Sequence, residues 1–262
     1  MTDVALITGA SSGIGEAFAR RLASEGYNLF LVARSGEKLA DLSNELAGLH
    51  KIRAFYLAAD LTRPEADKTV FEYAAENQLD VTLLINNAGV GSMGDFAKLP
   101  LERELEMIDL NVRAAVALCR LFLPQMRSRS SGTIINVSSA AGFQPVPFMA
   151  TYAATKSFLT AFSEAIAEEN RPFGIQILAL CPGSTDTAFF ENAKMQRSFS
   201  FKGQQTPEEV VETALRAIRR RKVVAISGWA NRLVARAVNF VPNRVITRSV
   251  ARGLRRRFQE DK

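Results

Sequence analysis

Short apolar runs alternate with longer amphipathic runs along most of this 262-residue chain. The apolar runs are almost continuously hydrophobic, which is typical of strands that are covered on both faces of a sheet. The amphipathic runs between them have the periodicity of helices. This alternation predicts an α/β fold with a parallel sheet and right-handed crossovers. The seven predicted strands are 3–8, 28–33, 52–58, 81–86, 132–138, 175–180 and 223–227.

The length and the 47% of hydrophobic residues are enough for one large domain with a substantial core. We expect this domain to span residues 1–228 and a basic amphipathic extension to span residues 229–262. Residues 184–205 have little periodicity and several phenylalanines. Because a loop of this length in a compact domain is usually functional, we expect it to form a substrate lid.

The net charge of +6 is unevenly distributed. Residues 216–262 hold 14 Lys and Arg but only 2 Asp and Glu, so the preceding body is acidic. A nucleic-acid-binding domain more often carries its basic charge on the folded surface, so we expect no nucleic-acid partner. No metal site is expected, because His50 is the only histidine. No signal peptide or apolar run of about 20 residues is visible, which predicts a cytoplasmic protein.

The first predicted strand ends in the sequence TGASSGIG, which places Gly9, Gly13 and Gly15 at a strand-to-helix turn. Glycines there let the backbone approach a pyrophosphate, and a helix N-terminus favours an anionic group. The turn therefore predicts a dinucleotide site. An ordinary tight turn is the alternative.

The second predicted strand ends in Ala33, Arg34 and Ser35, without the acidic residue that would bind the ribose hydroxyls of NAD. An arginine matches a 2′-phosphate in charge and in geometry, so this strand end favours NADP over NAD. A solvated arginine at the start of the next helix is the alternative. Asp60 ends the third strand, where it either accepts from an adenine amino group or caps the helix near Pro64.

Tyr152 and Lys156 are four residues apart in YAATK, so a helix places them on one face. An ammonium group beside a phenol stabilises the phenolate, which predicts a lowered pKa for Tyr152 and a role in proton transfer. Ser139 ends the fifth strand and can meet the phenol at one carbonyl oxygen. A helix with one aromatic anchor and one solvated lysine is the alternative. Asn111 interrupts another helical stretch, which it can bend, or it can hold a water.

These motifs occur in one order that resembles the short-chain dehydrogenase/reductase family. The motifs are TGASSGIG, NNAG, the asparagine of DLNVRA, the serine pair, YAATK and the PG that ends the sixth strand, and the similarity covers about residues 3–226. The resemblance implies a single-domain, doubly wound Rossmann fold of about seven parallel strands. Residue by residue, it implies the catalytic set Asn111, Ser139, Tyr152 and Lys156.

The resemblance also implies a nicotinamide cofactor, with NADP favoured by Arg34. The expected cofactor-binding residues are Gly9, Ser11, Ser12, Gly13, Ile14, Gly15, Arg34, Ser35, Asp60, Leu61, Asn87, Ala88, Gly89, Tyr152, Lys156, Pro182, Gly183, Thr185 and Thr187. Lys156 would also hold the nicotinamide ribose, and Asn111 would hold a water that links Lys156 to solvent. Tyr152 would protonate the carbonyl oxygen during reduction, while Ser139 stabilises the oxyanion.

The expected function is interconversion of a hydrophobic carbonyl compound and its alcohol. The expected pocket is apolar, and its candidate residues are Met93, Phe96, residues 143–148, Phe189, Phe190, Met195, Phe199 and Phe201. Some of these phenylalanines can instead pack the lid against the body. A catalytically weak NADP sensor and a regulatory protein at a lipid surface are alternative functions. Both keep the fold but not necessarily the activity.

We expect a homo-oligomer, a dimer or a tetramer, because the helices around residues 101–127 and 151–169 have more apolar positions than one sheet-facing stripe needs. Examples are Leu118, Phe122, Phe158 and Phe162. The tail predicts two amphipathic helices separated at Pro242. Their apolar stripes either contact an anionic membrane, cover the substrate mouth, or pack on the protein or a second subunit. The apolar residues are Trp229, Leu233, Ala237 and Phe240 in the first helix and Val245, Ile246, Ser249, Val250 and Leu254 in the second.

Overall fold

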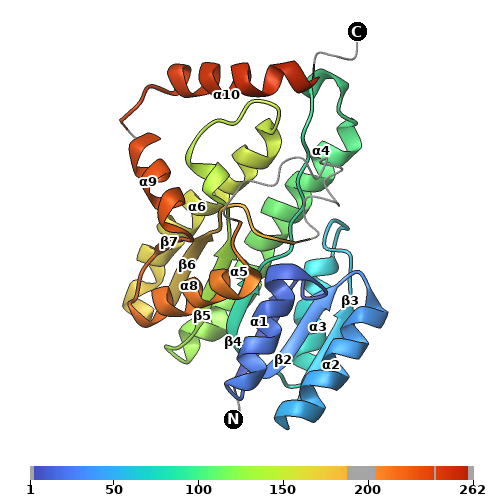
Figure 1. The fold of residues 1–262 in the computed structure, drawn as a ribbon. Coiled ribbons are helices and arrows are strands. Elements are labelled where there is room, and N and C mark those ends of the chain that lie inside the picture. Colours follow the sequence, from blue (N-terminus) through green and yellow to red (C-terminus); the bar gives the residue numbers. More distant parts are fainter. Residues whose placement is uncertain (1–2, 188–203, 239, 259–262) are drawn as a thin grey trace.

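A computed structural model describes residues 3–187, 204–238 and 240–258, and the structural statements below concern those residues. Seven parallel strands form one sheet in the order β3-β2-β1-β4-β5-β6-β7 (Figure 1). This confirms the predicted α/β fold and all seven predicted strands. The strands are β1 (Val4–Thr8), β2 (Asn28–Ala33), β3 (Ala54–Ala58), β4 (Val81–Asn86), β5 (Thr133–Val137), β6 (Gln176–Cys181) and β7 (Val224–Ile226).

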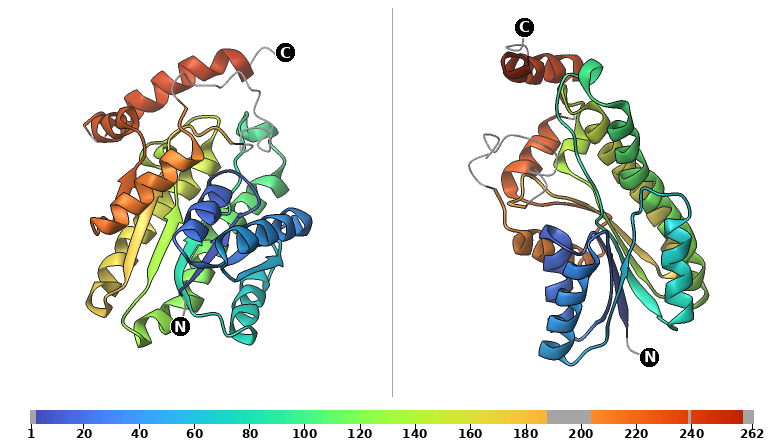
Figure 2. Two further views of the ribbon diagram at one scale, coloured as in Figure 1. Left: turned by 60° about the horizontal axis from the view of Figure 1, so that its bottom comes forward. Right: turned by 90° about the vertical axis from the view of Figure 1, so that its right-hand side faces the viewer.

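Helices cover both faces of the sheet (Figure 2). One face packs against α1 (Gly13–Ser24), α2 (Gly36–His50) and α8 (Pro207–Arg219). The other face packs against α3 (Ala66–Glu76), α5 (Ala114–Ser128) and α6 (Ala150–Asn170), and α4 (Leu101–Ile108) contacts α6. Short helical turns are η1 (Phe96–Lys98), η2 (Asp109–Arg113), η3 (Ala140–Phe143) and η4 (Arg171–Phe173).

The core lies in two layers, one on each side of the sheet. Along β1, Ala5 and Ile7 pack into one layer, whereas Val4 and Leu6 pack into the other. Successive side chains of a strand point to opposite faces, so a strand with helices on both sides must be apolar throughout. The edge strand β3 is an exception to the predicted coverage. It is only partly buried, and Tyr56 is exposed, because no helix covers all of this edge.

The sheet order reverses at β1, which has β2 on one side and β4 on the other. The chain first builds β2 and β3 outward from β1 and then returns to start β4 beside it. At such a point the crossovers lead away in opposite directions, and a crevice forms at the carboxyl ends of the strands. The fold therefore places the loops after β1 and β4 next to each other.

The C-terminal extension forms α9 (Trp229–Val238) and α10 (Asn243–Phe258), which confirms the two helices predicted on either side of Pro242. Both lie beyond the carboxyl ends of the strands, and α10 lies across the top of the molecule in Figure 1. Within the described residues, no helix combines the length and the apolar character that are needed to cross a bilayer.

The surplus apolar positions on α5 differ from the prediction. Leu118 and Phe122 are almost fully buried against their own sheet, so they are not available to a second subunit. On α6, Phe158 is exposed and stacks on the partly buried Phe162. The periodicity of a helix shows that it has a wide apolar face, but not how much of that face its own sheet covers.

Candidate active site

A cavity of about 1210 Å³ opens at the carboxyl edge of the sheet. The loops after β1 to β6 contribute to its wall, together with α6, α9 and α10. Almost all of the predicted catalytic and cofactor-binding residues line this cavity. The two that do not line it are Gly15 and Asn111.

The glycine-rich turn is shaped by close backbone approach. Gly9 and Gly13 have φ angles of +64° and +58°, in the left-handed region that favours glycine. A Cβ atom on Gly15 would lie 2.3 Å from the carbonyl oxygen of Gly9, so Gly15 serves the packing of α1 on β1. Ser12 precedes α1 without a side-chain cap, which leaves the first-turn amides of α1 directed at the cavity. This is an anion-binding arrangement.

Polar contacts fix the β4 loop to this turn. The Asn87 side chain donates to the carbonyl oxygens of Thr8, at 2.9 Å, and of Gly9, at 3.2 Å. The buried Thr8 hydroxyl accepts from the backbone amides of Asn87 and Ala88, both at 3.0 Å. Asn87 therefore holds the glycine-rich turn in place. Thr8 was not among the predicted residues, although it begins the TGASSGIG motif.

The far end of the cavity is polar. Arg34 and Ser35 after β2, and Asp60 after β3, line it together. Asp60 accepts from the backbone amide of Thr62 at 3.1 Å and from its hydroxyl at 2.8 Å. Burial opposes ionisation of Asp60, but these bonds and the charges of Arg34 and Arg63 outweigh it and lower its pKa. The residue before α3 is Glu65, so Asp60 closes its own turn and does not cap that helix.

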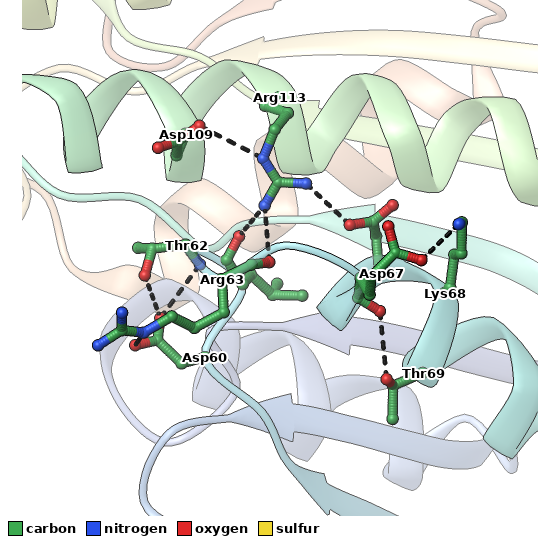
Figure 3. A network of polar contacts seen from close by, with 10 residues as sticks. Asp60, Thr62, Arg63, Asp67, Lys68, Thr69, Asp109 and Arg113 are labelled. Atoms are coloured by element: carbon green, nitrogen blue, oxygen red, sulfur yellow. Dashed lines mark hydrogen bonds and ion pairs between the residues drawn. The ribbon is translucent and has the colours of Figure 1, made fainter.

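Arg113 anchors the loop that carries Asp60 (Figure 3). Its guanidinium donates to Asp67 at 2.8 Å and to the carbonyl oxygens of Leu61, at 2.7 Å, and of Arg63, at 3.1 Å. It also pairs with Asp109 at 3.3 Å. The β3–α3 loop is thereby fastened to η2. This pairing joins residues 46 positions apart, and no local pattern in the sequence indicated it.

The predicted catalytic side chains converge at the centre of the cavity. Ser139 precedes η3, and Tyr152 and Lys156 lie one turn apart on α6. A hydrogen bond joins the hydroxyls of Ser139 and Tyr152. The neighbouring Ser138 donates to the Lys156 carbonyl oxygen at 2.6 Å, so it secures α6 to the end of β5.

The predicted lowering of the Tyr152 pKa by Lys156 is wrong for this geometry. Burial raises the pKa of Tyr152, and the hydrogen bond with Ser139 opposes this only in part. The Lys156 amine donates to the Val137 carbonyl oxygen at 2.8 Å and lies 5.9 Å from the centre of the Tyr152 ring. Burial lowers the pKa of Lys156 to about 8. The lysine therefore has its own backbone partner, the Val137 carbonyl oxygen.

Asn111 lies in η2, a π-helical turn between α4 and α5. Its side chain accepts from the Val90 amide and donates to the Val90 carbonyl oxygen, both at 2.9 Å. It also donates to the Thr155 hydroxyl at 3.1 Å, and that hydroxyl donates to the Tyr152 carbonyl oxygen. Asn111 thus connects the β4 loop to α6. Thr155 was missed, although it lies inside the YAATK motif.

The loop after β6 completes the central wall with Pro182, Gly183, Thr185 and Thr187. The two described ends of the predicted lid pair through Thr185 and Gln205, and the middle of this segment lies outside the described residues. Asn231 of α9 packs so tightly on Gly183 that a Cβ atom there would lie 1.9 Å from the Asn231 amide nitrogen.

The mouth of the cavity is mainly apolar. Four of the predicted substrate residues line it, namely Met93, Phe143, Gln144 and Val146. Phe96 and Phe148 are not part of the wall. The predicted Phe189, Phe190, Met195, Phe199 and Phe201 lie outside the described residues. Several further apolar residues of the wall were not predicted, namely Val90, Leu110, Met149, Val234 and Val238.

Both tail helices contribute to the mouth of the cavity. This agrees with one of the alternatives predicted for the tail, in which its helices cover the substrate mouth. Val250 and Leu254 of α10 are partly buried and line the cavity. Their helical spacing in the sequence predicted an apolar stripe, but it did not predict that the stripe would line the cavity. In α9 the inward residues are Asn231, Ala235 and Val238.

Comparisons with known proteins match this architecture. The family model described as short chain dehydrogenase matches residues 3–198. Very-long-chain 3-oxoacyl-CoA reductase-A of Danio rerio is 32% identical, over 88% of this chain and 73% of that protein. A 7beta-hydroxysteroid dehydrogenase of Mediterraneibacter gnavus is 33% identical, over 87% of this chain and 86% of that protein. The chain spans about half the length of two other curated relatives, both named very-long-chain 3-oxoacyl-CoA reductase.

Among solved structures, a short-chain dehydrogenase from Sphingobium yanoikuyae in complex with NADPH superimposes with a TM-score of 0.81. It is 34% identical, and the match covers 86% of this chain and 87% of that one. The family model and the related proteins cover most of the chain, including the whole glycine-rich turn and the Ser–Tyr–Lys centre. The chain therefore belongs to the short-chain dehydrogenase family of oxidoreductases, which act on alcohol and carbonyl groups.

Proposed function

We propose that this protein is an NADP(H)-dependent oxidoreductase that interconverts a hydrophobic carbonyl compound and its alcohol. The observation that carries this proposal is one continuous cavity, which has a polar far end, a central Ser139–Tyr152–Lys156 group and an apolar mouth. A dinucleotide fits the far end and the turn before α1, and an apolar substrate fits the mouth.

The far end fits NADP(H) in its charges and backbone shape. The uncapped amides of α1 suit the pyrophosphate, and Arg34 stands where a 2′-phosphate would meet the protein. The sequence supplies no acidic residue at the end of β2 to bind the ribose hydroxyls instead. The related short-chain dehydrogenase from Sphingobium yanoikuyae is in complex with NADPH, which supports the same cofactor here.

The chemistry assigned to the chain concerns the substrate oxygen. When bound, the nicotinamide supplies or accepts the hydride. In the reductive direction Tyr152 gives its phenolic proton to the carbonyl oxygen, and it takes the proton back during oxidation. Ser139 donates a hydrogen bond to the charge that develops on that oxygen. Lys156 and Asn111 hold the α6 side of the site against β5 and the β4 loop.

Relatives named for fatty-acyl and steroid substrates support a hydrophobic compound in the mouth. The test is NADPH oxidation with long-chain and bulky ketones, compared with small keto acids and keto sugars. We expect turnover with the apolar group only. Tyr152→Phe should lower kcat roughly 10²- to 10⁴-fold and leave NADPH affinity nearly unchanged.

Tyr56→Phe is the matched control, because Tyr56 is exposed on β3 and does not line the cavity. It should keep the activity of the wild type. NADPH binding without turnover of any ketone would favour a cofactor sensor instead. Near-normal activity of Tyr152→Phe would refute the proton-donor role.

A further inference from the structure

The outer face of α9 is apolar and exposed. Trp229 is 75% exposed and Leu233 is 56% exposed, and Phe240 just after the helix is 89% exposed. The inward face of α9 is formed by other residues, Asn231, Ala235 and Val238. The stripe that the sequence indicated is therefore exposed to solvent. Contiguous exposed apolar surface of this kind marks an interaction site.

Exposed arginines occur on both tail helices. Arg232 and Arg236 are exposed on α9, one on either side of Leu233 in the sequence. On α10, Arg244, Arg248 and Arg252 recur every four residues and are exposed, whereas Val250 and Leu254 on the same helix line the cavity. The sequence from 229 to 258 contains eight arginines and no acidic residue. The partner must therefore combine an apolar interior with a negatively charged surface.

We propose that α9 and α10 form a docking surface for an anionic phospholipid bilayer. Helices that lie in a membrane interface place aromatic and aliphatic side chains at the acyl boundary and basic side chains among the headgroups. Trp229, Leu233 and Phe240 match the first role, and the arginines match the second. The acidic body favours contact through this end of the molecule.

The same surface continues into the mouth of the cavity. Trp229 and Val234 are exposed and also line the cavity wall. Both tail helices lie at the carboxyl edge of the sheet, where the cavity opens (Figure 1). A bilayer docked on α9 would thus lie beside the apolar entrance. An apolar compound dissolved in the bilayer would reach the mouth along an apolar surface.

Trp229 is the only tryptophan of the chain, so its fluorescence reports on the docking surface directly. The full chain, without cofactor or substrate, is mixed with phosphatidylcholine vesicles or with vesicles in which about a third of the lipid is phosphatidylserine. We expect a blue shift and co-sedimentation with the anionic vesicles only. Lipids brominated in the acyl chains should quench the emission. Both signals should fall when NaCl is raised from about 50 mM to about 500 mM.

Two variants separate the apolar and the charged contributions. Leu233→Ser with Phe240→Ser removes apolar contacts and keeps Trp229, and Arg236→Glu with Arg248→Glu reverses two charges. We expect each to weaken vesicle binding, the charge reversal by roughly a hundredfold. None of the four residues lines the cavity, so turnover of a ketone in solution should be unchanged.

Matched controls lie elsewhere on the molecule. Leu49→Ser changes an apolar residue of α2 that is 68% exposed, and Arg219→Glu with Arg220→Glu reverses two exposed charges at the end of α8. Both controls should bind vesicles like the wild type. Equal binding to neutral and anionic vesicles would overturn the proposal, and so would unchanged binding of both test variants. A dimer that Leu233→Ser converts to a monomer, without vesicle binding, would identify a second copy as the partner.

Discussion

Burial shifts the pKa values of Tyr152 and Lys156 in opposite directions, because it disfavours the charged form of each group. The phenol is charged after losing a proton, whereas the amine is charged after gaining one. It raises the pKa of the phenol and lowers the pKa of the amine to about 8. At neutral pH, Tyr152 is therefore a neutral acid that holds the proton it would donate. This protonation state suits carbonyl reduction.

The raised pKa of Tyr152 predicts the pH at which phenolate forms. Its folded-state pKa lies above the ordinary value of about 10, so the phenol should remain protonated throughout the neutral range in the cofactor-free protein. The measurement is the phenolate absorbance of the wild type minus that of Tyr152→Phe, which removes the signals of the other three tyrosines. A midpoint of the Tyr152 phenolate titration below pH 10 would contradict this. Alcohol oxidation, which needs the phenolate, should rise with pH.

Arg34 predicts a difference between the two nicotinamide dinucleotides. Arg34→Ala removes the positive charge proposed to meet the 2′-phosphate, so the Kd for NADPH should rise about tenfold or more. The Kd for NADH should hardly change, because NADH lacks that phosphate. Isothermal titration with both cofactors measures this. Arg53→Ala is the control, since Arg53 lies outside the cavity wall and stacks on Phe55. Equal losses for both cofactors in Arg34→Ala would be evidence against an NADP site.

The sequence predicted the residues whose roles follow from local structure. Ser139 lies two residues after β5, and Tyr152 and Lys156 are spaced by one helical turn of α6, so the motif order and spacing indicated that the three lie together. Thr8, Thr155 and the Arg113–Asp67 pair were not predicted. Their partners come from other elements, and side-chain contacts between distant segments depend on packing that periodicity does not encode.

At the scale of elements, η2 links the two ends of the cavity. Asn111 in this π-helical turn connects to Val90 and Thr155 on the catalytic side. Arg113, two residues later, holds the β3–α3 loop on the far side. Single π-helical turns are rare and often occur at functional sites. Here the turn lets neighbouring residues face two different loops.

Removing the Arg113 guanidinium should loosen the loop that carries Asp60. Arg113→Met keeps most of the side-chain length but leaves the buried Asp67 without its ion pair. We expect the free energy of unfolding to fall by about 1.5–3 kcal/mol, measured by denaturant titration. The KM for NADPH should rise more than kcat falls, because the network holds the β3–α3 loop at the far end of the cavity.

Lys68→Met is the control for Arg113→Met within the same network (Figure 3). Lys68 pairs with Glu65 on the surface, and such exposed pairs contribute little to stability. Its free energy of unfolding and its KM for NADPH should stay close to the wild type. Replacing Asp67 by Asn together with Arg113→Met should recover part of the lost stability, since no unpaired charge then remains. A role in cofactor positioning would be excluded if Arg113→Met changed stability alone.

The tail shows what a helical pattern can and cannot predict. The apolar stripes of α9 and α10 were both visible in the sequence. Leu233 and Phe240 of the first stripe are exposed outside the cavity wall, whereas Val250 and Leu254 of the second line the cavity. A stripe has the same spacing in both cases. Its direction depends on how the chain turns at Pro242 and on what already occupies the carboxyl edge of the sheet.

At the scale of the whole molecule, a second exposed apolar surface lies on α4 and α6. Leu105 is 51% exposed and Phe158 is 45% exposed, and Leu101 and Ile108 extend the surface along α4. The two helices contact each other. Single exposed apolar residues are normal on a monomer, but a surface that spans two helices often marks an interface. We therefore expect this surface to be covered by another copy of the chain.

Charge introduced on this surface should therefore dissociate the oligomer. We expect light scattering to show a dimer or tetramer for the wild type and a smaller species for Leu105→Glu with Phe158→Glu. Leu49→Glu on α2 is the matched control and should leave the mass unchanged. A wild type that stays monomeric at micromolar concentration would contradict the expected homo-oligomer.

The position of Val250 and Leu254 in the cavity wall also affects how the protein is made. A chain folds from its N-terminal part onward while it is being synthesised. The sheet and the Ser139–Tyr152–Lys156 centre are encoded before residue 229, whereas the wall of the mouth requires residues up to Leu254. A nascent chain on the ribosome can therefore assemble its catalytic centre before it has an enclosed place for a substrate. We therefore expect the cavity mouth to be enclosed only after α10 has left the ribosome and docked.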